Sequence, residues 1–121
     1  MAWKKTSPEM IAFMDSATAD LPCSRKLMFG GVAYFANGNM FAGVHQDTPF
    51  IRLSEPDREA LTARWDEASP FEPMEGRPMR EYVLLPEALY SDSGTLREWI
   101  ERSLGYASAL VPGKAGKKAR S

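Results

Sequence analysis

The sequence predicts an α+β domain in which an antiparallel β-meander sheet packs with helices, in the element order α-β-β-β-β-α-β-α. Residues 25–53 are rich in strand-forming side chains and are divided by turn signals, which is the pattern of a meander. Amphipathic stretches over residues 9–21 and 93–110 carry apolar side chains at helical spacing. We therefore expect helices that bury one stripe each against the sheet.

Length and composition favour a single globular domain. The chain has 121 residues, of which 44% are hydrophobic and 26% charged, both ordinary values for a folded protein. No apolar run approaches the roughly 20 residues that cross a bilayer, and residues 1–7 lack the apolar stretch of a signal peptide. Cys23 is the single cysteine, so an intramolecular disulfide is excluded. We expect a cytoplasmic protein.

The first helix has a clear start in the sequence. Ser7 can cap the helix, Pro8 suits its first turn, and the carboxylate of Glu9 complements the positive helix end. Pro22 limits the helix, because the residue before a proline avoids the helical region. The apolar stripe expected to face the core is Met10, Phe13, Met14, Ala17 and Leu21.

A β-hairpin is predicted at Asn37-Gly38, because a two-residue type I′ turn needs positive φ at both central positions. Counting outward from this turn pairs Tyr34 with Phe41 and Val32 with the glycine two residues further on. One sheet face would then carry Val32, Tyr34, Phe41 and His45, and the other Ala33, Phe35, Met40, Ala42 and Val44. Both faces are apolar, so we expect helices or a second subunit to cover part of each.

A second, shorter helix is expected to begin at Ser54, with that residue as its N-cap and acidic residues in the first turn. Residues 69–78 hold three prolines and a glycine, which favours a loop. Phe71 and Met74 give this loop apolar groups that can anchor it on the body of the domain.

The last strand and the closing helix follow. Residues 79–85 alternate as a strand does and end at Pro86. Residues 93–110 form the longest predicted helix, with Glu98 and Arg102 as a supportive i, i+4 pair outside. Its buried stripe is expected to be Leu96, Trp99, Ile100, Leu104 and Ala107. The predicted domain thus spans residues 1–111.

Residues 112–121 are expected to be a disordered basic tail, because they have no apolar periodicity. Their four basic residues are Lys114, Lys117, Lys118 and Arg120. The rest of the chain keeps eleven basic against sixteen acidic residues, a net charge of about −5. A body of that sign repels a phosphate backbone, which disfavours general nucleic-acid binding outside the tail.

No reactive constellation stands out in the sequence. His45 is the single histidine and lies where a strand ends, so the sequence favours a structural role for it. Cys23 and His45 would act as nucleophile and base only if the fold brings them together. Four charged tail residues without aromatics offer neither stacking nor base readout. We predict no catalytic, metal-binding or cofactor-binding residues.

Residues 25–42, which read RKLMFGGVAYFANGNMFA, resemble the opening of the TfoX N-terminal domain family of TfoX/Sxy competence regulators. Later blocks of that family are similar to residues 50–53, 70–73, 77–82 and 96–99. The resemblance implies a compact α+β domain, linked in the full-length regulators to transcriptional control of DNA-uptake genes, and implies no catalysis. Those regulators carry a second, C-terminal helical domain, whereas this sequence is expected to be the stand-alone N-terminal domain. The family's signature falls on Lys26, Met28, Phe29, Gly30 and Gly31.

The function we expect is that of a small non-enzymatic regulatory or adaptor domain that binds a protein partner, or a second copy of itself, through a sheet face or edge. The alternative is direct nucleic-acid binding by basic residues that converge on one surface, Arg25, Arg52, Arg77 and Arg80. A third class, an enzyme acting on a small molecule, requires a deep pocket with convergent polar groups.

Overall fold

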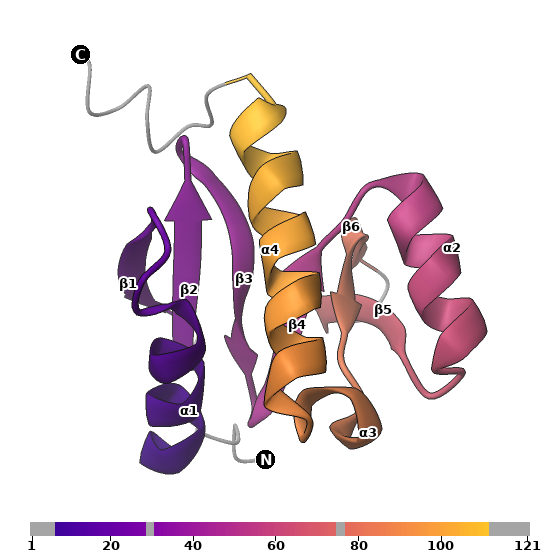
Figure 1. The fold of residues 1–121 in the computed structure, drawn as a ribbon, viewed down its shortest axis with the longest axis horizontal. Helices are drawn as coiled ribbons and strands as arrows, with labels where there is room; N and C mark the ends of the chain where they lie inside the picture. The colour runs from indigo at the N-terminus through magenta and orange to yellow at the C-terminus, as the bar shows by residue number, and fades with distance from the viewer. Residues whose placement is uncertain (1–6, 29–30, 75–76, 112–121) are drawn as a thin grey trace.

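A computed structural model describes residues 7–28, 31–74 and 77–111, with the backbone alone for residues 28, 72–74 and 77–80. The chain folds into one antiparallel sheet and four helices (Figure 1). The elements are α1 (Pro8–Thr18), β1 (Ser24–Met28), β2 (Gly31–Ala36), β3 (Asn39–His45), β4 (Thr48–Arg52), α2 (Glu55–Arg64), β5 (Ser69–Met74), β6 (Arg77–Leu84), α3 (Glu87–Tyr90) and α4 (Ser93–Ala109).

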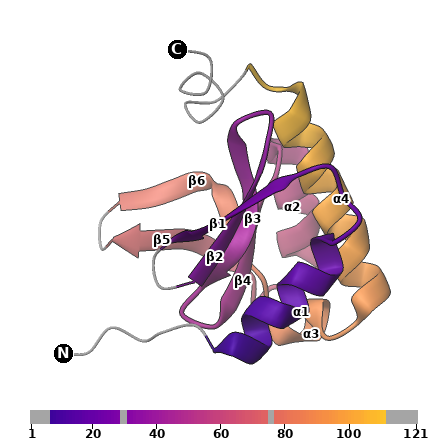
Figure 2. The same ribbon diagram turned by 90° about the vertical axis from the view of Figure 1, so that its left-hand side faces the viewer.

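The sheet has the strand order β1-β2-β3-β4-β6-β5, so β1 and β5 are its edges. Figure 2 shows α1, α3 and α4 together on one side of the sheet, while β5 and β6 extend away from these helices. We call the side that packs against the helices the helical face; it carries Val32, Tyr34, Val44, Ile51 and Val83. The opposite side, the open face, carries Phe50, Phe71 and Tyr82.

The predicted α+β class and element order are confirmed, with two additions. The expectation of a loop over residues 69–78 is wrong, because residues 69–74 form β5 and pair with β6. The ladder shifts register twice along β5, so its prolines fall in an irregular edge strand, where a missing amide is tolerated. The second addition is the short helix α3, which follows Pro86. The predicted tail, residues 112–121, lies outside the described residues.

The hairpin at Asn37-Gly38 is confirmed, since both residues have positive φ, 55° and 77°. The predicted pairing holds for the two residue pairs next to the turn and then fails at a β-bulge. Tyr34 lies opposite Ala42 rather than Phe41, because Phe41 is the extra residue. Phe41 and Ala42 therefore both pack into the core of the helical face.

Because of the bulge, the predicted faces of β3 are wrong beyond Phe41. Val44 pairs with Val32 and lies on the helical face, whereas the sequence analysis placed it on the opposite face. His45 moves to the open face, where its ring meets Phe71. A single inserted residue thus reverses the facing of every later residue in the strand, as expected from the two-residue period of a strand.

Helix ends follow the predicted signals with two differences. The Ser7 hydroxyl accepts a hydrogen bond from the Met10 amide, which confirms the first cap. Helix α1 ends at Thr18, earlier than Pro22 requires, and the Thr18 hydroxyl donates to the Met14 carbonyl. Ser54 occupies the N-cap position of α2, but its side chain makes no capping hydrogen bond.

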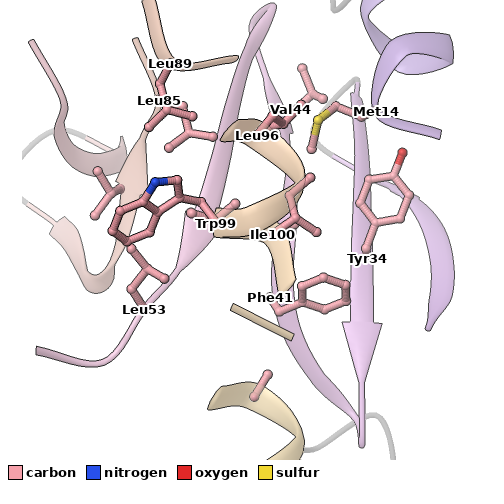
Figure 3. Packing of buried hydrophobic residues seen from close by; sticks show 14 of the residues in the cluster. Met14, Tyr34, Phe41, Val44, Leu53, Leu85, Leu89, Leu96, Trp99 and Ile100 are labelled. Carbon is pink, nitrogen blue, oxygen red and sulfur yellow. The ribbon is translucent and has the colours of Figure 1, made fainter. Parts of the chain in front are cut away.

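The core of the helical face lies between the sheet and α4 (Figure 3). Trp99, Ile100 and Leu96 project from α4 onto the sheet, and Met14 of α1 closes one side. Leu61 is the residue through which α2 joins the same core. Among the described residues no helix is both long and apolar enough to cross a membrane.

Ser103 ties α4 to the sheet from within this core. Its hydroxyl donates to the Phe41 carbonyl at 2.6 Å and accepts from the Arg52 amide at 3.2 Å, and the residue is fully buried. Phe41 and Arg52 lie next to Ala42 and Ile51, the last pair of the β3–β4 ladder, so the hydroxyl bridges the two strands just beyond that ladder. The hydroxyl therefore stabilises both the bulge and the docking of α4.

We expect Ser103→Ala to lower the free energy of unfolding by about 2 kcal/mol. The change removes the hydroxyl that bonds the Phe41 carbonyl and the Arg52 amide, so both backbone groups lose this partner. Urea denaturation followed by circular dichroism measures this loss. Ser108→Ala, on the exposed side of the same helix, is the matched control and should change stability by less than about 0.5 kcal/mol. Equal losses for the two variants would contradict the role given to Ser103.

Candidate functional site

The edge strand β1 is the most accessible regular element near the family-signature residues. It pairs with β2 alone, from Ser24 opposite Phe35 to Met28 opposite Gly31. Ser24, Arg25, Lys26 and Leu27 are all exposed. An uncovered edge strand presents unpaired amides and carbonyls and is a ready template for another strand.

Leu27 gives this edge an apolar side chain. It lies opposite Val32, so it shares the helical face, but 64% of its surface is exposed because it stands at the margin of the sheet. In the part of the chain that the structure describes, only Val111 among the large hydrophobic residues is similarly exposed, at 82%. Nothing in the sequence pattern distinguishes Leu27 from a core residue, because edge position depends on strand order.

Beside β1, a charged cluster joins the strand to α1. The Asp15 carboxylate accepts hydrogen bonds from Arg25 Nε at 2.8 Å and from the Tyr34 hydroxyl at 2.6 Å. Burial would raise the pKa of Asp15, but the bonds from Arg25 and Tyr34 outweigh it and hold that pKa below its ordinary value. Burial and the neighbouring carboxylate raise the pKa of Tyr34, so its phenol stays a donor.

The comparison with known families can now be set against this geometry. A model of the TfoX N-terminal domain matches residues 19–107, from the turn after α1 to the last turns of α4. The chain belongs to the TfoX N-terminal domain family. The resemblance that the sequence motifs indicated is thereby confirmed. No curated protein matches the chain.

The signature of this TfoX N-terminal domain maps to β1 and its connection to β2. Lys26 lies at the centre of the edge strand, opposite Ala33, and its side chain is exposed on the open-face side. Met28 and Gly31 end and begin the two strands. Phe29 and Gly30 lie outside the described residues, as does the side chain of Met28. The described part of the signature is thus an edge, not a cleft.

The predicted basic surface of the TfoX N-terminal domain is not assembled by the described residues. Arg25 is on β1 and contacts Asp15 of α1, whereas Arg52 is on β4, across two intervening strands, and contacts Glu81 of β6 and Tyr106 of α4. Arg52 contacts the Glu81 carboxylate at 2.7 Å and stacks over the Tyr82 and Tyr106 rings. The side chains of Arg77 and Arg80 lie outside the described residues.

The pairing of Arg52 is part of a compact polar node. Glu81 accepts from Arg52 and also from the Tyr106 hydroxyl at 2.9 Å, which links α4 to β6. Burial would raise the pKa of Glu81, but these bonds hold the pKa below its ordinary value. Because Arg52 is half-buried and committed to this node, it is a structural residue in this arrangement.

Cys23 and His45 are not brought together. Cys23 packs against the core of the helical face, and burial raises the pKa of its thiol. His45 lies on the open face with its ring 5.2 Å from that of Phe71, and burial lowers the pKa of its imidazole. The sheet separates the two side chains. Among the described residues, no three His, Cys, Asp or Glu side chains gather as a metal site would require.

Three hollows border α1 in the described part of the chain, with volumes of about 360, 410 and 210 Å³. The first two include Phe13, and the first continues over Ala17 and Leu96 toward Arg97. Arg97 is itself held by Asp20 and Glu101 at 3.1 and 2.8 Å. The third is lined by Cys23 together with Asp15, Arg25 and Tyr34, and there the Asp15 carboxylate already accepts from Arg25 and Tyr34. No histidine is among the described residues that line these hollows.

Proposed function

We propose that this TfoX N-terminal domain is a non-enzymatic regulatory or adaptor domain that binds a protein partner through the exposed edge of β1. One observation carries the proposal: the family signature coincides with an uncovered edge strand that exposes Leu27. Natural proteins usually cover or charge such edges. This edge carries Arg25 and Lys26 but also keeps an exposed leucine, which suits strand addition by a partner that complements both features. A role in transcriptional control of competence, acting in the cytosol, is the regulatory setting that the family suggests.

The rival functions receive less support from the described residues. Direct nucleic-acid binding needs a contiguous basic surface, and the two predicted arginines with described side chains are separated by two strands and each is paired with its own carboxylate. Catalysis by the Cys23 thiol needs a base beside it, and the sheet separates Cys23 from His45. Partner binding requires neither feature.

We expect Leu27→Lys to abolish capture of the partner while leaving the fold intact, because residue 27 is exposed and the change replaces its apolar contact with a third positive charge on β1. Affinity capture from the native lysate should use wild-type, Leu27→Lys and Val111→Lys baits in parallel. Val111 is the matched control, since it is equally apolar and exposed but lies beyond α4.

The informative protein is one retained by the wild-type and Val111→Lys baits but lost with Leu27→Lys. Titration of that purified protein against the three baits should then reproduce the loss. A transcription factor behaving in this way would support the regulatory role. If every retained protein binds all three baits equally, the β1 edge is not the binding surface.

A further inference from the structure

We propose that the segment which adds to β1 is an extended, acidic stretch of a different protein, with acidic and apolar residues in alternation. This inference rests on the proposed function and specifies the chemistry of its partner. It is carried by the charges on the edge and by the facing of its side chains.

The backbone of β1 sets the geometry of the complex. In an antiparallel ladder, every second residue of an edge strand turns its amide and carbonyl away from the existing sheet. A strand of five residues, Ser24–Met28, therefore offers two or three such residues to a partner. An added segment would become the seventh strand and would continue the alternation of the sheet, with neighbouring side chains on opposite faces.

The charges on β1 favour a negatively charged partner. The strand reads SRKLM, so it contains two basic residues and no acidic one. Arg25 is held by Asp15, whereas among the described residues no carboxylate lies within ion-pair distance of Lys26. A carboxylate directly opposite Lys26 would complete a cross-strand pair of opposite charge, which is a stabilising arrangement.

The facing of the two central residues sets the pattern within the partner. Lys26 points to the open-face side and Leu27 to the helical side, as their partners Ala33 and Val32 do. A partner residue opposite Lys26 and its neighbour opposite Leu27 therefore lie on different faces. The first should be acidic and the second apolar, because only the second can cover the exposed Leu27 side chain.

The same charges disfavour a second copy of this chain as the occupant. Antiparallel pairing over all five residues of β1 would place Lys26 of one copy directly opposite Lys26 of the other. At a cross-strand Cβ separation of about 5 Å, like charges are destabilising. Any shift in register that separates the two lysines also reduces the number of paired residues. A partner of opposite charge avoids both the repulsion and the shorter ladder.

Fluorescence anisotropy with synthetic peptides tests this chemistry without knowledge of the partner. The probes are a short peptide that alternates glutamate with valine, the same peptide with lysine for glutamate, and the acidic peptide with alternate amides N-methylated. We expect the acidic peptide to bind the wild-type domain about tenfold more tightly than the lysine peptide at low salt, and Lys26→Glu to reverse that order. N-methylation should abolish binding, because it removes the ladder hydrogen bonds.

The outcomes separate this inference from the proposed function. Equal binding of the acidic and lysine peptides, or tighter binding of the lysine peptide, would overturn the acidic preference but leave strand addition standing. If neither peptide binds while Leu27→Lys still loses a captured protein, the inference fails and the proposed function survives. If Leu27→Lys has no effect either, both fail. Two further results would overturn the proposal of an acidic partner. One is a wild-type domain that sediments as a dimer and becomes a monomer after Leu27→Lys. The other is an oligonucleotide that the domain retains through Lys26.

Discussion

Replacing Phe71 by alanine is expected to lower the free energy of unfolding by about 4 kcal/mol, the largest single loss that we predict for this domain. Phe71 is fully buried on the open face although it belongs to an edge strand. Its ring stacks on that of Phe50 with centroids 4.4 Å apart, and its edges meet Tyr82 and His45. Removing it opens a cavity among the Phe50, Tyr82 and His45 rings.

Denaturation by urea, monitored by circular dichroism, measures this loss. Phe71→Leu keeps most of the volume but removes the aromatic stacking, so it should cost about 1.5 kcal/mol. Comparing the losses of the two variants distinguishes the contribution of packed volume from that of ring stacking. A loss of less than about 1 kcal/mol for Phe71→Ala would mean that β5 does not seal the open face.

The second large effect is expected at Gly43, whose Cα faces the Phe50 ring across the ladder. A Cβ built at this position would lie 2.6 Å from Phe50 Cζ and 2.6 Å from the Val32 carbonyl oxygen. Gly43→Ala should therefore lower the free energy of unfolding by about 3 kcal/mol, and Gly43→Val should do so further. The reason is steric, because the carbonyl belongs to a paired strand and cannot retreat.

Gly105→Ala is the matched control, since a Cβ there meets no atom within 4 Å and the site is an exposed helical position. It should stabilise the domain by about 1 kcal/mol. Phe50→Leu combined with Gly43→Ala should recover part of the loss only, because the clash with the Val32 carbonyl remains. Full tolerance of Gly43→Ala would contradict the close approach of these strands.

Local signals in the sequence predicted much of the fold. Ser7 at the start of α1 and Asn37-Gly38 in the hairpin have local chemical preferences that need no knowledge of distant residues. The stripe of α4 was also predictable, because Leu96, Trp99 and Ile100 recur at helical spacing and are buried. These are features whose cause lies within a few residues.

Features that depend on distant partners were not predictable. Pro70 and Pro73 favour a loop in the sequence, and only the pairing with β6 makes their segment a strand. The bulge at Phe41 has no marker in the sequence, and it reverses the facing of His45. The sequence does not indicate that position 43 must be glycine. That need arises from Phe50, which packs against Gly43 from the next strand.

The candidate site also combines features that the sequence predicted with features that depend on distant residues. The family signature at Lys26 was readable as a motif, and its sequence context indicated a strand. That this strand is an edge, and that Leu27 is exposed there, follows from a strand order that no local pattern encodes. The partner of Arg25 was equally hidden, because Asp15 reaches it from the preceding helix.

The order of strands in the sheet has a consequence for synthesis on the ribosome. Strands β1 to β4 pair with one another only as sequence neighbours, and β4 pairs with β6 in addition, so this four-stranded part of the sheet can form as soon as it emerges. The cover for its apolar side comes mostly from α4, which is translated after all six strands. The nascent chain therefore passes through a stage with a completed but uncovered sheet, and that interval is when it is most exposed to aggregation.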